Sequence, residues 1–185
     1  NPYTDPKRAG RVLLHPDHRQ LAREAAEKSL VLLRNDPVGD APLLPLKETG
    51  KVALIGRLAE SGKDMLGAWV LRGRAEDVVT LKDAMETRLG ERMVYQPGVP
   101  MTGTSTDGLE AAVEAARSAD LVVMAIGEPE RLSGEAHSRT RLGLPGRQLD
   151  MLKAVMATGQ PVVLVLFSGR PLALPWEAQH VPAIL

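Results

Sequence analysis

The chain has 185 residues, 44% of them hydrophobic and 25% charged, which is enough to bury the core of one ordinary domain. Its 23 basic residues balance its 23 acidic residues, so it lacks the positive field that would attract a nucleic acid or an anionic membrane, and neither is expected as a partner. The absence of cysteine excludes disulfides and thiolate metal sites and leaves the cellular compartment open.

Residues 1–46 are predicted to form a linker and a first helix that lead into the domain. Polar residues and two prolines predict a coil over 1–10. Over 15–35, apolar positions such as Leu21 and Ala25 alternate with charges such as Glu24, the pattern of an amphipathic surface helix. A proline-rich loop follows this helix.

Residues 47–185 alternate between strand and helix patterns. The predicted strands and helices are, in chain order, strand 51–56, helix 76–89, strand 92–96, helix 107–118, strand 120–126, helix 145–158 and strand 161–167. Such alternation predicts a parallel sheet with helices on both faces. We therefore predict an α/β fold, a three-layer α/β/α sandwich with a mostly parallel sheet.

Residues 182–185 begin a further apolar strand at the end of the sequence. Because a domain rarely ends on an unfinished buried strand, we expect this domain to be truncated at its C-terminus and to be a fragment of a larger enzyme.

Two loops, 57–75 and 127–144, are much longer than the usual connection between a strand and a helix. Because parallel strands share a direction, the loops after strands 51–56, 120–126 and 161–167 open on one edge of the sheet, where ligands bind in such folds. The residues expected at this edge are Trp69, Glu128, Glu135, Ser168 and Arg170. The sequence therefore predicts the functional site there.

Neither a nucleotide nor a metal is predicted at this edge. The segment from Gly56 to Lys63 follows a strand, but five residues separate its glycines and Asp64 follows the lysine, so it fails the P-loop pattern. The histidines offer one close pair, His15 and His18, and no third ligand. We expect no cofactor.

The two tryptophans have different expected roles. Trp69 lies in a glycine-containing loop, where its indole can stack on a sugar ring or can plug the end of the sheet, and the residues alone leave both open. Trp176 is expected to pack as a structural residue.

Several motifs follow one another along the chain in a specific order: REAAEKSLVLLRN at 23–35, LLPL at 43–46, DMLGAW at 64–69, GRAED at 73–77, SGEAHSR at 133–139, LPGRQ at 144–148, VVLVL at 162–166 and SGRPL at 168–172. In this order they resemble the C-terminal sandwich domain of family 3 glycoside hydrolases, the bacterial β-glucosidase type. The resemblance covers nearly the whole chain.

The resemblance implies a retaining enzyme that hydrolyses β-glucosides or oligosaccharides. In such enzymes an N-terminal barrel contributes the aspartate nucleophile, and this domain contributes the general acid/base and part of the sugar pocket. The barrel is absent from this sequence, so the fragment alone is expected to be inactive. The alternative is a non-catalytic, doubly wound module that uses the same edge to hold a small molecule or a partner.

By its position in the motif, the resemblance implies Glu135 as the acid/base, with Glu128 and Glu130 as rivals in the same loop. An acid catalyst must stay protonated, which requires burial or a neighbouring carboxylate, so Glu135 is expected to be exposed until a second domain covers it. Arg139 would favour an ionised carboxylate and is interpreted as supporting the loop. The lone His137 is interpreted as a surface or structural residue.

Overall fold

The computed structural model describes residues 3–47 and 49–185, which divide into one unit ending at Leu32 and a second unit from Leu33 to Leu185. The first unit holds a 3₁₀ turn, Pro6–Arg8, and two helices, α1 (Ala9–Val12) and α2 (Pro16–Ser29), none of which buries a side chain. The prediction of a helix over 15–35 was wrong at its C-terminal end, because α2 ends at Ser29 and the residues after Leu33 join the sheet.

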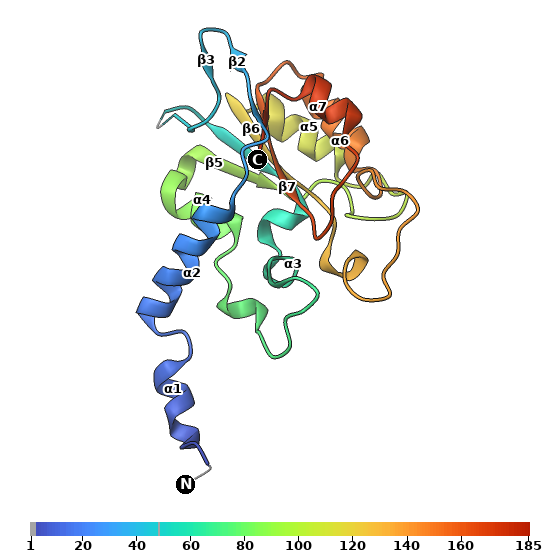
Figure 1. The fold of residues 1–185 in the computed structure, drawn as a ribbon. Helices are drawn as coiled ribbons and strands as arrows, with labels where there is room; N and C mark the ends of the chain where they lie inside the picture. The colour runs from blue at the N-terminus through green and yellow to red at the C-terminus, as the bar shows by residue number, and fades with distance from the viewer. Residues whose placement is uncertain (1–2, 48) are drawn as a thin grey trace. The chain divides into compact units, whose positions relative to one another are not determined.

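In the described residues of the second unit, six strands form one sheet in the order β1-β8-β7-β6-β4-β5 (Figure 1). Their bounds are β1 Arg34–Asn35, β4 Val52–Ile55, β5 Met93–Gln96, β6 Leu121–Gly127, β7 Val162–Phe167 and β8 Ala183–Ile184. Only the pair β1–β8 is antiparallel. The mostly parallel α/β fold is therefore confirmed, with each of the five predicted strands present, and β1 is an addition that the sequence did not predict.

The sequence predicted that the domain starts at residue 47. The unit that contains the sheet starts earlier, at Leu33. Residues 37–46 form part of this unit, with a separate hairpin of β2 (Pro37–Val38) and β3 (Ala41–Pro42). In the described residues, every helix is too short or too polar to cross a membrane.

The helices and 3₁₀ turns of the second unit are η2 Arg57–Glu60, α3 Gly62–Leu66, η3 Ala75–Asp77, α4 Leu81–Leu89, η4 Gly90–Arg92, α5 Leu109–Arg117, η5 Glu130–Leu132, α6 Gln148–Met156 and α7 Pro175–His180. Three of them, α4, α5 and α6, lie within the helices predicted from the sequence. The helix predicted from residue 76 starts later, at Leu81, because Thr80 and Asp83 form a capping box at that point.

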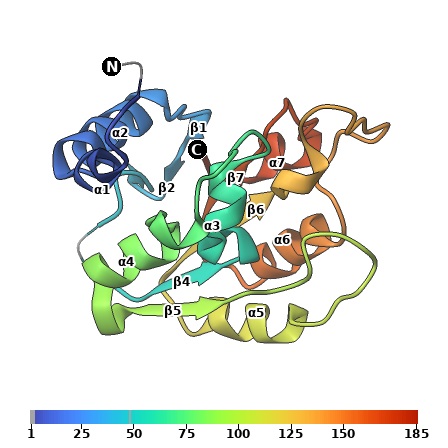
Figure 2. The same cartoon turned by 90° about the horizontal axis from the view of Figure 1, so that it is seen from below.

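Side chains of the central strands alternate between two hydrophobic clusters, one on each face of the sheet. Ala53, Met124 and Leu164 pack with α5 and α6 on one face, and Leu54, Val123 and Val163 pack with α4 and η2 on the other. Figure 2 shows α4 on one side of β4 and β5 and the pair α5 and α6 on the other. The sandwich thus covers both faces of the sheet and leaves its two ends open for the loops.

Candidate active site

The two long loops at the carboxyl ends of β4 and β6 meet each other, as the shared direction of these strands predicts. The Lys63 ammonium forms an ion pair with Glu130 at 2.6 Å, and this contact raises the pKa of Lys63. A Cβ placed on Gly134 would lie 2.9 Å from the Cβ of Ala68, so the residues next to Glu135 and Trp69 pack against each other. The segments that carry Glu135 and Trp69 therefore lie on the same edge of the sheet.

Glu128, the first residue after β6, is a buried ionic centre. Its side chain has no exposed surface. One carboxylate oxygen accepts a hydrogen bond from Nη1 of Arg139, and the other accepts hydrogen bonds from Nε of Arg170 at 3.2 Å and from the Ser168 hydroxyl at 3.3 Å. Both oxygens are thus engaged by protein groups, and the buried charge is balanced by two guanidinium groups.

The two arginines also hold the backbone of the loop over 127–144. Arg170 donates to the carbonyls of Leu132 and His137, the second at 2.7 Å, and Arg139 donates to the carbonyl of Gly143 at 3.1 Å. Because one guanidinium carries several rigid donors, each arginine fixes the Glu128 carboxylate and the surrounding loop together. The interpretation of Arg139 as a loop support agrees with these contacts.

Glu135 lies at the tip of this supported loop, in a turn closed by a hydrogen bond of 3.2 Å from the His137 N–H to the Gly134 carbonyl. The following residue, Ala136, has φ 62°, a conformation that residues other than glycine rarely adopt. His137 directs Nδ1 at the Ser133 carbonyl, 2.9 Å away, so its ring takes part in the turn. Glu135 is exposed, and within residues 3–47 and 49–185 its carboxylate has no hydrogen-bond or ion-pair partner.

Trp69 is 72% exposed, and Leu71 at the tip of the same segment is 98% exposed. The indole therefore does not plug the end of the sheet within this chain, which was one of the two interpretations that the sequence left open. Trp176, in contrast, packs against the core and stacks on His180 with ring centroids 4.4 Å apart. Its expected structural role agrees with this packing.

Gln148 at the start of α6 anchors the end of β6, a role that the sequence did not indicate. This buried side chain accepts a hydrogen bond from the Gly127 N–H at 2.9 Å and donates to the carbonyls of Gly127, Met101 and Pro145. It satisfies backbone groups at the point where the chain leaves the sheet, and the loop that carries Glu135 starts there.

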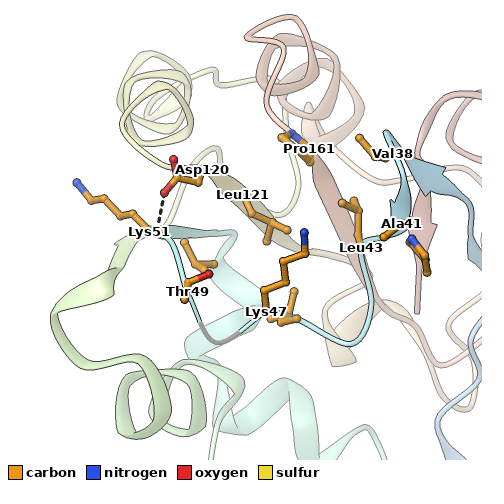
Figure 3. A pocket seen from close by; sticks show the side chains of 12 residues that line it. Val38, Ala41, Leu43, Lys47, Thr49, Lys51, Asp120, Leu121 and Pro161 are labelled. Carbon is orange, nitrogen blue, oxygen red and sulfur yellow. Dashed lines mark hydrogen bonds between the residues drawn. The ribbon is translucent and has the colours of Figure 1, made fainter.

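A cavity lies at the opposite end of the sheet, before β4, β6 and β7 (Figure 3). Its volume is about 270 Å³, and apolar side chains such as Leu43 and Leu121 line it. Figure 3 shows Lys47 across this cavity, while the side chain of Lys51 points away from it. This cavity shares no residue with the edge that holds Glu135.

Sequence reasoning missed the cluster of Glu128, Arg139 and Arg170 as a unit. The available signal was the position of Glu128 directly after a fully apolar strand, because such a residue still lies within the sheet and must find partners if it is charged. The resemblance pointed to the loop but did not distinguish a buried carboxylate from an exposed one.

A family model described as the glycosyl hydrolase family 3 C-terminal domain matches residues 30–185. A periplasmic β-glucosidase of Salmonella typhimurium is 37% identical over 91% of this chain, and a β-xylosidase of Formosa agariphila is 33% identical over 91%. The chain spans about a quarter of the length of these relatives, 24% of each.

Solved structures show the same architecture. A β-glucosidase from Listeria innocua superposes with a TM-score of 0.87 and 34% identity over the whole of this chain, which corresponds to 25% of that protein. The same Listeria enzyme in complex with glucose gives a TM-score of 0.83 over 93% of this chain and 23% of its own. A β-glucosidase from Erythrobacter marinus, 29% identical, gives 0.84 over the whole chain and 28% of its own length.

Proposed function

Because this chain belongs to the glycosyl hydrolase family 3 C-terminal domain family, we propose that it forms one half of the active site of a retaining β-glucosidase. An N-terminal barrel of the same polypeptide supplies the other half, including an aspartate nucleophile. In this proposal residues 1–32 contain the linker and first helix that connect the barrel to the sandwich domain, which begins at Leu33. The sugar pocket forms only when the barrel covers the exposed edge that carries Glu135.

Glu135 is the general acid/base in this proposal. In the first step its carboxyl proton passes to the glycosidic oxygen as the C–O bond breaks and the aspartate attacks the anomeric carbon. In the second step the Glu135 carboxylate removes a proton from water, which releases the sugar from the enzyme with its configuration retained. The two carboxyl groups must then lie about 5 to 5.5 Å apart when the barrel is in place.

One observation carries the assignment: of the three glutamates in the loop, Glu128 and Glu130 are engaged by protein cations, and Glu135 has no partner among the described residues. A carboxyl group that must reach the substrate has to be free of such contacts. Glu130 is held by Lys63 and is largely covered, with 16% of its side chain exposed. Its position therefore suits support of the loop better than proton transfer.

The test joins this chain to the upstream part of its own polypeptide and measures hydrolysis of 4-nitrophenyl β-glucoside, with the matching β-xyloside in parallel. Glu135→Ala is expected to lower activity on alkyl β-glucosides by about 10² to 10⁴-fold, the usual contribution of general acid–base catalysis. Added azide should restore turnover of the aryl glucoside and yield a β-glucosyl azide, because the small anion attacks the covalent intermediate without needing a base.

Glu130→Ala is the matched control, because it removes a carboxylate from the same loop. Azide is expected to leave its activity unchanged. If the joined protein hydrolyses neither glycoside but still binds glucose, the chain is instead a non-catalytic binding module. Preference for the β-xyloside would keep the mechanism and change the sugar.

Trp69 provides a stacking face for the sugar in this proposal, since its exposed indole lies on the segment that packs beside Gly134. Trp69→Ala should raise KM for the glucoside about tenfold, in line with the loss of one aromatic contact. Unfolding of the variant should stay close to that of the wild type, because the side chain is exposed. An unchanged KM would remove Trp69 from the sugar pocket.

A further inference from the structure

Two short helices of this domain begin with the same pattern, a hydroxyl residue followed three positions later by an aspartate. In α4, Asp83 turns back on its own N-cap and accepts hydrogen bonds from the Thr80 N–H at 3.0 Å and the Thr80 hydroxyl at 2.7 Å. In α3, Asp64 occupies the equivalent position after Ser61, and its Oδ2 accepts a hydrogen bond from the Ser61 hydroxyl.

The second oxygen of Asp64 leaves the helix and accepts a hydrogen bond of 2.6 Å from the Glu130 N–H, in the loop that carries Glu135. A carboxylate that accepts from a backbone N–H forms one of the stronger hydrogen bonds in proteins. The contact joins residues 66 positions apart. It is therefore a link between the two long loops and not a local cap.

The same segment touches the Glu135 loop at two further points. Lys63 pairs with the Glu130 carboxylate at 2.6 Å, and Ala68 lies against Gly134. Trp69 directly follows Ala68. The Asp64 carboxylate thus takes part in the contacts that join the segment carrying Trp69 to the loop carrying Glu135.

We propose that Asp64 is a positioning residue for Glu135. Its hydrogen bond to the Glu130 N–H fixes the Glu135 loop to α3 and so keeps Glu135 at a fixed position relative to Trp69. This inference rests on the proposed function, because it gives Asp64 its effect through the acid. Removal of the carboxylate frees the start of the loop while Arg139 and Arg170 still hold its other parts. Glu135 is then displaced without unfolding of the domain.

Leaving groups of different acidity detect such a displacement. Breaking the bond to an alkyl alcohol requires the proton from Glu135, whereas 2,4-dinitrophenolate leaves without one. The ratio kcat/KM reports the step in which this bond breaks and the aspartate attacks. A misplaced acid therefore slows hydrolysis of the alkyl glucoside much more than hydrolysis of the dinitrophenyl glucoside. A general loss of folded enzyme slows both reactions by the same factor.

The experiment uses the chain joined to its upstream region and compares Asp64→Ala, Asp64→Asn and the control Asp83→Ala. We expect Asp64→Ala to lower kcat/KM for methyl β-glucoside by about 10²-fold, the cost of a displacement near 1 Å, and for 2,4-dinitrophenyl β-glucoside by less than about threefold. Asp64→Asn keeps an acceptor oxygen for the Glu130 N–H and should recover part of the loss. Asp83→Ala should lower kcat/KM for both substrates by the same factor or leave both values unchanged.

A second arm places Asp64→Ala in the Glu135→Ala background. If Asp64 acts through Glu135, the double variant should be no slower on methyl β-glucoside than Glu135→Ala alone. Equal losses on both substrates, a further loss in the double variant, or wild-type kinetics for Asp64→Ala would each overturn the inference. If Glu135→Ala itself shows no dependence on the leaving group, the proposed function has failed. If it does and Asp64→Ala does not, only the positioning role has failed.

Discussion

Removal of the Glu128 carboxylate is predicted to destabilise the domain strongly. In Glu128→Ala, two donors lose their acceptor, Nη1 of Arg139 and Nε of Arg170, whereas the Ser168 hydroxyl keeps the Arg170 carbonyl at 2.5 Å. Breaking a buried ion pair by removing one partner costs about 3 to 5 kcal/mol. The two arginine side chains are 13% and 20% exposed and keep backbone carbonyl partners, so water replaces part of the loss. We therefore expect the free energy of unfolding to fall by about 3 kcal/mol, at the lower end of that range.

Urea unfolding of the 185-residue chain, followed by circular dichroism, measures this change. With an m-value near 2 kcal/mol per molar urea, the midpoint should fall by about 1.5 M. Glu128→Gln keeps the shape of the side chain but turns an amide N–H₂ toward an arginine, so its midpoint should lie between those of Glu128→Ala and the wild type. Glu135→Ala, an exposed change, should shift the free energy by less than about 0.5 kcal/mol.

Two results would refute this account of Glu128. One is a free energy of unfolding for Glu128→Ala within about 1 kcal/mol of the wild type, which would mean that the arginines find equal partners elsewhere. The other is a joined enzyme in which Glu128→Ala loses activity and azide restores it, because such rescue belongs to a carboxylate at the reacting atoms.

Three further predictions concern the ends of the strands and the caps. Gln148→Leu leaves the Gly127 N–H without its buried acceptor and should lower the free energy of unfolding in urea by about 3 kcal/mol; a loss below about 1 kcal/mol would mean that water takes its place. Gly127→Ala forces a side chain onto φ 144° and against the Phe167 carbonyl, so its melting temperature should fall by about 10 °C or more, while Gly10→Ala, where a Cβ meets open space, should not lower it. The hydroxyl and N–H of Thr80 lower the pKa of Asp83 from 3.8, so ionised Asp83 stabilises the fold above that pH and this contribution is lost as the pH falls through the lower folded value. The difference in urea midpoint between Asp83→Asn and the wild type should accordingly be constant near pH 7 and shrink as the pH falls below 3.8; a difference that does not decrease with pH below 3.8 would contradict this assignment.

The central strands were predictable because each is a short apolar run buried on both faces, and burial alone identifies them. The end of α2 was not. Leu30 to Leu33 continue the apolar pattern of the helix, but the Leu33 N–H donates to the Ile184 carbonyl at 2.8 Å, so a strand distant in sequence pairs with the chain from Leu33 onward. Tertiary pairing of this kind overrides local pattern and has no local signal.

The start of α4 was within reach of the sequence, because Thr80 and Asp83 stand at the spacing of a capping box. At the site, the edge of the sheet and the loop with Glu135 were predictable from strand direction and motif order. Which of its three glutamates pair with cations was not predictable, since Arg170 binds Glu128 from 42 positions away and Lys63 binds Glu130 from another loop. Which carboxylate is buried is decided by partners that only the fold brings together.

Strand β8 has a consequence for biosynthesis. It lies between β1 and β7, and the pairing of Arg34 with Ile184 joins the first and last strands of the sheet across 150 positions, 184 minus 34. Translation at roughly 5 to 20 residues per second separates the emergence of these two strands from the ribosome by about 8 to 30 s. During that interval β1 lacks the strand with which it pairs, so the β1 edge of the sheet cannot form until β8 has been made.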